Sequence, residues 1–384
     1  MDITIQPTKL QGALEVIPSK SQAHRLLICS AFADRPTTIC CRATNRDIDA
    51  TVDCLRALGA KIHCESFGFC VEPIRDIPQT ATMPCRDSGS TLRFLLPVVG
   101  ALGVDATFQM EGRLPQRPLS PLWEEMERMG CRLSRPTQDT IRCCGKLRSG
   151  HYTIAGNISS QFISGLLFAH MLMENCTLEI TGKLESAPYI ELTRQSIAKF
   201  PPKDSPVITV EGDWSNAAFW LAANELGSNL YVAALRQDSA QGDRVCADLI
   251  PRLAKHITID ASDIPDLVPI LSVMAAANQG AVFRNIERLR LKESDRVAST
   301  IAMLTALGGK AEATEDTLTI FGTGLVGGTV DAMSDHRIAM SAAIASTVCT
   351  KPVTILGAEC VEKSYPKFWA EFARLGGQYE LNLR

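Results

Sequence analysis

The chain has 384 residues, too many for one ordinary hydrophobic core, so we expect two domains of about 150 to 200 residues each. Its 39 basic and 42 acidic residues give a net charge of −3, which argues against nucleic acid as the main partner because binding a phosphate backbone needs surplus positive charge. No apolar run reaches the roughly 18 residues that span a bilayer, and the N-terminus resembles a strand rather than a targeting segment. We therefore expect a cytoplasmic globular protein that does not bind membranes.

Six apolar helices repeat along the chain, each opened by small or acidic polar residues. They begin near Ser21, Thr91, Gln161, Ser215, Asp266 and His336. Their bodies carry few polar side chains, which predicts that they are buried. Three of the five intervals between the starts are about 70 residues and the other two about 50, a spacing regular enough to indicate internal duplication.

Most of these units contain a second, amphipathic helix that ends at a glycine followed by a strand. The glycines are Gly59, Gly130, Gly308 and Gly376, as expected for left-handed helix stops. The units that start near Gln161 and Ser215 lack this glycine and are shorter by about the length of a β-hairpin. We therefore predict that two of the six units lack a strand pair. The proline-rich segment 201–206 is the best linker candidate, with three units on each side.

The chain shows no metal or cofactor motif. The fourteen cysteines include no C-x-x-C spacing, and the doublets Cys40-Cys41 and Cys143-Cys144 have no paired histidines nearby, so we expect reduced thiols. The glycine-rich segment 322–328 superficially resembles a dinucleotide fingerprint, but it precedes a predicted strand rather than a helix. A phosphate-binding loop of the G-x-x-x-x-G-K-[ST] type is absent.

Charged residues gather where one of the amphipathic helices begins. Segment 288–296 runs from a strand-like stretch into a helix that Ser294 or Asp295 can cap. Lys292 and Arg296 have the wrong sign for the positive end of a helix dipole, so they favour an anionic ligand there. A solvated, salt-bridged helix start is the alternative.

Five further clusters place cationic or hydrogen-bonding side chains at helix starts or in loops, although each alone also fits surface charge, a turn or a cap. They are 18–25, where Ser21 can cap the helix, 87–93, 113–118, 159–161, and 335–337 with 363–366. Together they suit a ligand with several negative charges. Asp266 and Glu293 are the candidates for proton transfer, with a simple N-cap as the alternative for Asp266.

These clusters closely resemble, in order along the chain, motifs of the 5-enolpyruvylshikimate-3-phosphate synthase (3-phosphoshikimate 1-carboxyvinyltransferase) family. The most specific match is Leu291–Arg296, followed by Asp335–Arg337. The other matches are Ser19–Ser21 with Arg25, Asp87–Ser90, Gln116–Pro118, Ser159–Phe162, Ser186–Tyr189, Glu211–Ser215, Ile264–Asp266 and Lys363–Pro366. The resemblance covers almost the whole chain.

The resemblance implies an α/β (α+β) fold of two domains, with an inverse α/β barrel-like arrangement of six βαβαββ-type units, two of them shortened. The first domain would span 18–211 and the second 1–17 with 212–384. We also expect a monomer without a cofactor.

The resemblance further implies a reaction, in which the 5-hydroxyl of shikimate 3-phosphate adds to C2 of phosphoenolpyruvate while C3 is protonated. The tetrahedral intermediate then expels phosphate. The residues implied to bind shikimate 3-phosphate are Lys20, Ser21, Arg25, Ser159, Ser160, Gln161, Ser186, Tyr189, Asp266 and Lys292. Those implied to bind phosphoenolpyruvate are Lys20, Gly89, Arg117, Gln161, Arg296, Arg337 and Lys363.

Three residues are implied to be catalytic: Asp266 as acceptor of the hydroxyl proton, Glu293 as the acid and base at the methylene carbon, and Lys20. We hypothesise that surrounding cations keep Glu293 ionised in the empty site and that bound anions raise its proton affinity. Arg288 replaces an amide often seen in the family, and Phe94 replaces a proline of some relatives, which leaves the response to glyphosate open.

Two alternatives differ from this function. UDP-N-acetylglucosamine enolpyruvyl transferases resemble this family in fold. They usually carry a reactive cysteine in the loop corresponding to 111–118, where this chain has none. A catalytically inactive repeat protein that binds anionic metabolites is the other alternative. The presence of both Asp266 and Glu293 argues against it, because binding alone would not require acids in a cationic site.

Overall fold

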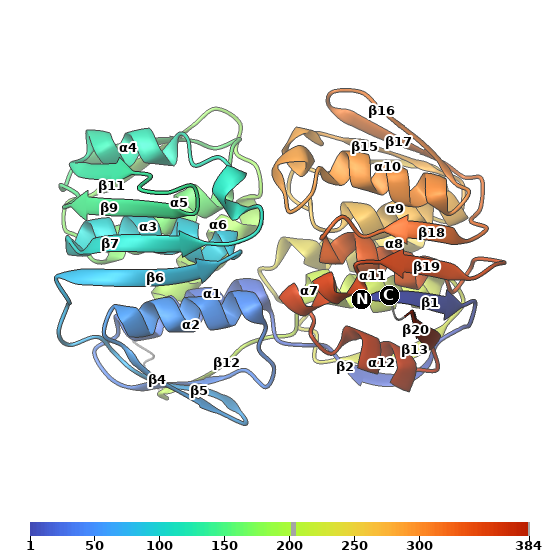
Figure 1. Cartoon of the computed structure of the whole chain (residues 1–384), viewed down its shortest axis with the longest axis horizontal. Helices are drawn as coiled ribbons and strands as arrows, with labels where there is room; N and C mark the ends of the chain where they lie inside the picture. The colour runs from blue at the N-terminus through green and yellow to red at the C-terminus, as the bar shows by residue number, and fades with distance from the viewer. Residues whose placement is uncertain (201–204, 383–384) are drawn as a thin grey trace. The chain divides into compact units, whose positions relative to one another are not determined.

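The computed structural model describes residues 1–200 and 205–382, which form two compact units (Figure 1). Unit 1 comprises Met1–Ile17 and Gly212–Arg384, and unit 2 comprises Pro18–Glu211. Most of the linker candidate 201–206 lies outside the described residues. The mixed α/β fold with two shortened repeats agrees with the expected fold class.

Unit 2 contains the first three repeats. Its elements are α1 (Lys20–Ala31), β3 (Thr37–Cys40), α2 (Arg46–Ala57), β4 (Lys61–Glu65), β5 (Gly68–Glu72), β6 (Thr80–Arg86), α3 (Gly89–Leu102), β7 (Asp105–Met110), η1 (Leu114–Gln116), α4 (Leu122–Arg128), β8 (Cys131–Ser134), β9 (Thr140–Gly145), β10 (His151–Ala155), α5 (Ser160–Met171), β11 (Thr177–Thr181), α6 (Ala187–Ala198) and β12 (Val207–Thr209).

Unit 1 contains the two N-terminal strands and the last three repeats. Its elements are β1 (Asp2–Gln6), β2 (Gln11–Glu15), α7 (Trp214–Glu225), β13 (Asn229–Ala233), η2 (Gly242–Val245), α8 (Cys246–Arg252), β14 (Ile257–Asp260), α9 (Val268–Ala277), β15 (Ala281–Arg284), η3 (Glu287–Leu291), α10 (Arg296–Ala306), β16 (Lys310–Ala313), β17 (Thr317–Phe321), β18 (Gly328–Asp331), α11 (His336–Ala345), β19 (Val353–Leu356), η4 (Ala358–Lys363), α12 (Phe368–Arg374) and β20 (Gln378–Asn382).

The predicted helix pattern is confirmed. All six apolar helices are present as α1, α3, α5, α7, α9 and α11, and most of their residues are buried. The four glycines predicted to stop α2, α4, α10 and α12 all have positive φ, from 85° at Gly308 to 116° at Gly130. These angles suit glycine because it has no Cβ to clash with the preceding carbonyl.

Two local predictions are wrong, and the alternative for Asp266 is excluded. Ser19, not Ser21, caps α1 by accepting a hydrogen bond from the Gln22 amide. Asp266 is not an N-cap, because Leu267 holds that position before α9. The strand-like stretch before Lys292 is the 3₁₀ helix η3, whose three-residue period buries one side chain, Leu289, and leaves its neighbours more exposed.

The sheets confirm that two of the six repeats lack a strand pair. Among the described residues, four sheets have four strands, in the orders β18-β19-β1-β20, β12-β3-β5-β4, β14-β15-β17-β16 and β6-β7-β9-β8. The other two sheets, β10-β11 and β13-β2, are parallel pairs. These two sheets belong to the two shortened repeats. In unit 1, β1 lies between β19 and β20 and is antiparallel to both.

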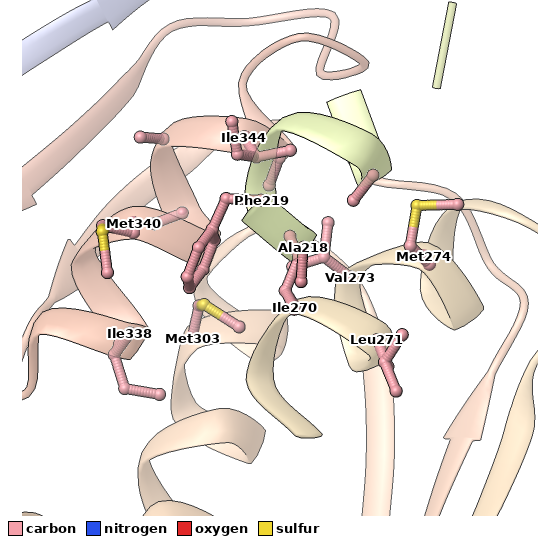
Figure 2. Close-up of a cluster of buried hydrophobic side chains, with 14 of the residues drawn as sticks. Ala218, Phe219, Ile270, Leu271, Val273, Met274, Met303, Ile338, Met340 and Ile344 are labelled. Atoms are coloured by element: carbon pink, nitrogen blue, oxygen red, sulfur yellow. The ribbon is translucent and has the colours of Figure 1, made fainter. Parts of the chain in front are cut away.

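Each unit is built around its apolar helices. In unit 1, Phe219 of α7, Ile270 of α9 and Ile344 of α11 are among the residues of one buried cluster, as Figure 2 shows. Because these helices are buried on all sides, their first turns are held rigidly by the core. None of the helices within residues 1–200 and 205–382 is both long and apolar enough to cross a membrane.

In unit 2, α5 approaches the backbone of α3 very closely at Gly165. A Cβ built on Gly165 would lie 2.2 Å from the carbonyl oxygen of Arg93. Since the obstacle is backbone rather than a flexible side chain, only glycine permits this approach. The contact sets the spacing between two helices whose first turns carry predicted site residues.

We predict that Gly165→Ala destabilises unit 2 by about 1 to 3 kcal/mol, because α5 must move away from α3 to relieve the overlap. Urea unfolding followed by circular dichroism would measure the loss. Gly182→Ala serves as a comparison for backbone strain alone, since a Cβ there meets no atom within 4 Å but a φ of 71° costs an alanine about 1 to 2 kcal/mol. Equal stability of the Gly165→Ala variant and the parent chain would contradict the close-packing argument.

Candidate functional site

In unit 1, the guanidinium of Arg296 binds three carboxylates. Its Nε donates to Asp335 Oδ2 at 2.8 Å, its Nη1 to Asp266 Oδ1 at 2.5 Å, and its Nη2 to Glu293 Oε2 at 2.8 Å. The Arg296 side chain is only 1% exposed. Such charge-assisted hydrogen bonds are strong, and a planar guanidinium orients its partners precisely. Arg296 therefore brings together the two predicted proton-transfer residues.

Local sequence determines where Arg296 lies. Asp295 caps α10 by accepting hydrogen bonds from the amides of Val297 and Ala298, so Arg296 is the first residue of the helix. Asp335 caps α11 by accepting from the Arg337 amide while it also binds Arg296. One buried carboxylate thus links the starts of two helices, which fixes the relative positions of Arg296 and Arg337.

Asp266 lies among three cations. Besides Arg296, it contacts Arg337 Nη2 at 3.4 Å through Oδ2 and Lys292 Nζ at 3.8 Å through Oδ1. Burial would raise the pKa of Asp266, but the positive charges of Lys292, Arg337 and Arg296 outweigh it and hold the pKa well below its usual range. Asp266 is therefore an ionised carboxylate held by three cations.

For Lys292, burial outweighs the attraction of the neighbouring carboxylate. Burial lowers the pKa of its ammonium group to about 8; Asp266 opposes this shift, and the neighbouring Arg296 and Arg288 add to it. Lys292 is thus mostly charged at neutral pH and loses its proton as the pH rises through about 8.

Sequence reasoning missed Asp243, which lies in η2 and is 1% exposed. It accepts a hydrogen bond from the Ser215 hydroxyl, and the Ser215 carbonyl in turn accepts one from Arg337 Nη1 at 3.1 Å. Burial, reinforced by the negative charge of Asp266, raises the pKa of Asp243 to about 7. Asp243 therefore anchors the first turn of α7, which supports Arg337. No pattern around residue 243 pointed to this contact.

In unit 2, Arg25 is buried and its donors contact several elements. Its Nε donates to Thr193 Oγ1 at 2.8 Å, its Nη1 to the Ser21 carbonyl at 2.6 Å, and its Nη2 to the Tyr189 carbonyl at 2.9 Å. The guanidinium also lies over the ring of Phe94, 4.9 Å from its centroid. Burial lowers the pKa of Arg25 to about 10, so it stays charged at neutral pH. Arg25 thus joins α1 to α6.

The starts of α3 and α5 form a second group in unit 2. Gln161 accepts from Arg93 Nη1 at 2.7 Å and donates to Ser90 Oγ at 2.9 Å. A Cβ on Gly89 would lie 2.7 Å from Arg117 Nη1 and 3.0 Å from Arg93 Nη1, so glycine lets both guanidinium groups approach the helix start. The group combines helix amides with two cations, as an anion site requires.

Arg93 and Asp47 are further residues that sequence reasoning did not assign to the site. Arg93 is a buried cation in the otherwise apolar helix α3, and that contrast is a signal that could have identified it. Asp47, also buried, binds Lys20 Nζ at 3.0 Å. Lys20 is thereby held at the first residue of α1.

The remaining predicted residues lie at helix ends. Ser159 caps α5, and Ser160 is its first residue. Ser186 precedes α6 with a φ of 56°, a left-handed conformation uncommon for serine. Lys363 ends η4 and is 8% exposed. Within the described residues, no group of three or more His, Cys, Asp or Glu side chains is arranged to hold a metal ion.

Comparison with known proteins matches the chain to one family. The model of the family described as EPSP synthase (3-phosphoshikimate 1-carboxyvinyltransferase) matches residues 5–203 and 249–372, and leaves 204–248 between them unmatched. A 3-phosphoshikimate 1-carboxyvinyltransferase of Clostridium kluyveri is 36% identical, covering 98% of this chain and 98% of that protein. One of Clostridium perfringens is 37% identical with the same coverage.

Solved structures share the fold. An EPSP synthase from Acinetobacter baumannii aligns with a TM-score of 0.80 at 21% identity, covering 99% of this chain and 100% of the other. The enolpyruvyl transferase NikO from Streptomyces tendae aligns with a TM-score of 0.73 at 16% identity, covering 99% and 98%. At these identities the alignments support the arrangement of elements and not a substrate.

We predict that the Lys292 ammonium titrates near pH 8 and that Asp266→Asn moves the titration to lower pH, because the substitution removes the carboxylate that stabilises the charged form. NMR titration of isotope-labelled lysine side chains, with Lys292→Arg to assign the signal, would measure both values. An ordinary lysine titration above pH 10 in the parent chain would contradict this account of the site.

Proposed function

Because this chain belongs to the EPSP synthase (3-phosphoshikimate 1-carboxyvinyltransferase) family, we propose that it transfers the enolpyruvyl group of phosphoenolpyruvate to the 5-hydroxyl of shikimate 3-phosphate. The reaction releases phosphate through a tetrahedral addition intermediate and serves aromatic amino-acid biosynthesis. The single observation that carries the assignment of roles is the binding of Asp266 and Glu293 to the same guanidinium of Arg296.

The cationic groups of the two units are proposed to bind the substrates' anionic groups. Shikimate 3-phosphate is assigned to Lys20, Ser21, Arg25, Ser159, Ser160, Gln161, Ser186, Tyr189, Asp266 and Lys292. Phosphoenolpyruvate is assigned to Lys20, Gly89, Arg117, Gln161, Arg296, Arg337 and Lys363. Arg93 and Asp47 are added as positioning residues, since they hold Gln161 and Lys20 through the contacts described above.

Substrate anions would compete with the protein's own carboxylates. Arg296 has its hydrogen-bonding edges filled by Asp266, Glu293 and Asp335, and Arg337 also contacts Asp266. A phosphate or carboxylate that binds these guanidinium groups weakens their hold on Asp266 and Glu293. Each carboxylate then loses the positive charge that opposes its protonation.

This exchange assigns the proton transfers. Asp266 becomes a stronger base when its cations turn to the substrate, and it accepts the proton of the attacking 5-hydroxyl. Glu293 gains proton affinity in the same way and delivers a proton to the methylene carbon. In the second step Glu293 takes back a proton from the resulting methyl group as phosphate leaves. Lys20, held by Asp47, places a positive charge beside the departing phosphate.

We expect phosphate release from phosphoenolpyruvate when shikimate 3-phosphate is the acceptor, because the assigned donors match its phosphate group. A coupled phosphate assay would follow the reaction, with UDP-N-acetylglucosamine as the alternative acceptor. Release with the UDP-sugar alone would replace the proposed acceptor, and release with neither would favour the catalytically inactive anion-binding protein.

Glu293→Gln is expected to lower kcat by about 10²- to 10⁴-fold, because the amide cannot transfer a proton. Both substrates should still bind when measured by calorimetry, and phosphoenolpyruvate at least as tightly, since the amide keeps nearly the same size and competes less for Arg296. Glu287→Gln is the control, because Glu287 is exposed in η3 and binds no site residue in any described contact. Full activity in the Glu293→Gln enzyme would remove Glu293 from the mechanism.

A further inference from the structure

The shortened repeat in unit 1 leaves one edge of β13 without a neighbouring strand. In three of the full-length repeats, an antiparallel strand covers the corresponding edge: β5 pairs with β3, β9 with β7, and β17 with β15. β13 pairs within the described residues only with β2. After α8 the chain passes directly to β14, so no hairpin follows that helix.

Backbone geometry shows which groups face this edge. The Asn229 amide and the Ala233 carbonyl form hydrogen bonds on the β2 side of the strand. The backbone amides and carbonyls of Leu230 and Val232 therefore point away from β2, toward the open edge. The Asn224 side chain occupies both backbone groups of Leu230, at 2.7 Å each. The Val232 amide and carbonyl have no hydrogen-bond partner in the part of the chain that the structure describes. One residue's backbone groups thus remain available.

Beside this edge lies a hollow of about 470 Å³ between α7, α8 and residues 231–237. Apolar side chains such as Leu221, Tyr231, Leu235 and Pro251 line it, and nearly half of its exposed surface is polar. Tyr231 is 72% exposed, an unusual exposure for an aromatic side chain. Glu225 is the one charged residue among those that line the hollow, and it forms no ion pair within the described residues.

We propose that this hollow binds a small molecule that combines an aromatic or other apolar group with a protonated amine. Its volume lies within the range of about 300 to 1,000 Å³ typical of small-molecule sites. The exposed ring of Tyr231 offers apolar area and attracts cations. The Glu225 carboxylate and the Val232 carbonyl accept hydrogen bonds, so the charge of the lining selects an amine over an acid.

A strand from a peptide or from a second copy of the chain fits this edge less well. Strand addition needs a row of free backbone groups, and Asn224 already fills half of the outward-facing groups of β13. The hollow also differs from the proposed active site, because none of the residues that line it is assigned to a substrate or to proton transfer. The proposal therefore does not depend on the proposed function.

Calorimetry on the full chain at low salt would test the proposal with three probes of similar shape: phenethylamine, 2-phenylethanol and 3-phenylpropionate. Phenethylamine should bind one site per chain, the alcohol about threefold more weakly, and the acid more weakly still. Glu225→Gln should reduce the affinity for phenethylamine to about that of the alcohol. Asp248→Asn, which removes the same charge from an exposed position of α8 outside the lining, should leave it unchanged.

A second variant tests the location. Ala247→Phe places a ring in the hollow and should abolish binding of phenethylamine, whereas Ala254→Phe at an exposed position outside the lining should not. Equal affinity for all three probes, or phenethylamine binding that survives Ala247→Phe, would overturn the proposal. Dimerisation of the chain that Ala247→Phe abolishes, detected by light scattering, would assign the hollow to a second copy instead.

Discussion

The contact of Arg296 with three carboxylates is the interaction on which the site in unit 1 depends. It joins the start of α10 to the cap of α11 through Asp335, and it holds Asp266 and Glu293 within hydrogen-bonding distance of one cation. A guanidinium so deeply buried is stable because each of its three nitrogens has a carboxylate partner. The same arrangement keeps Asp266 ionised.

The repeats explain how a chain of ordinary composition builds such a site. Each apolar helix is buried, so its first turn is held in a fixed position by the core. The two deletions remove strand pairs that follow α6 and α8 and leave the helix starts intact. Loss of sheet therefore affects the edges of the units, where Asn224 replaces part of the missing strand's hydrogen bonding.

Much of the fold could be predicted because its signals are local and periodic. Apolar helices, glycine stops and the two short intervals each depend on residues near one another in sequence. The site was less predictable. Side-chain partners from distant elements, such as Asp243 with Ser215 and Asp47 with Lys20, leave no spacing to recognise. The 3₁₀ turn at Arg288–Leu291 was mistaken for a strand because alternation over so few residues cannot separate the two periods.

The central claim is that substrate anions displace Glu293 from its cation and so raise its affinity for a proton. Carbon-13 NMR of enzyme labelled at glutamate carboxyls, with Glu293→Gln to assign the signal, would test it directly. The enzyme would be titrated alone and with shikimate 3-phosphate plus phospholactate, which keeps the phosphate and carboxylate of phosphoenolpyruvate but has no methylene to protonate. The account predicts that Glu293 is protonated at higher pH in the doubly liganded enzyme; identical titrations would contradict it.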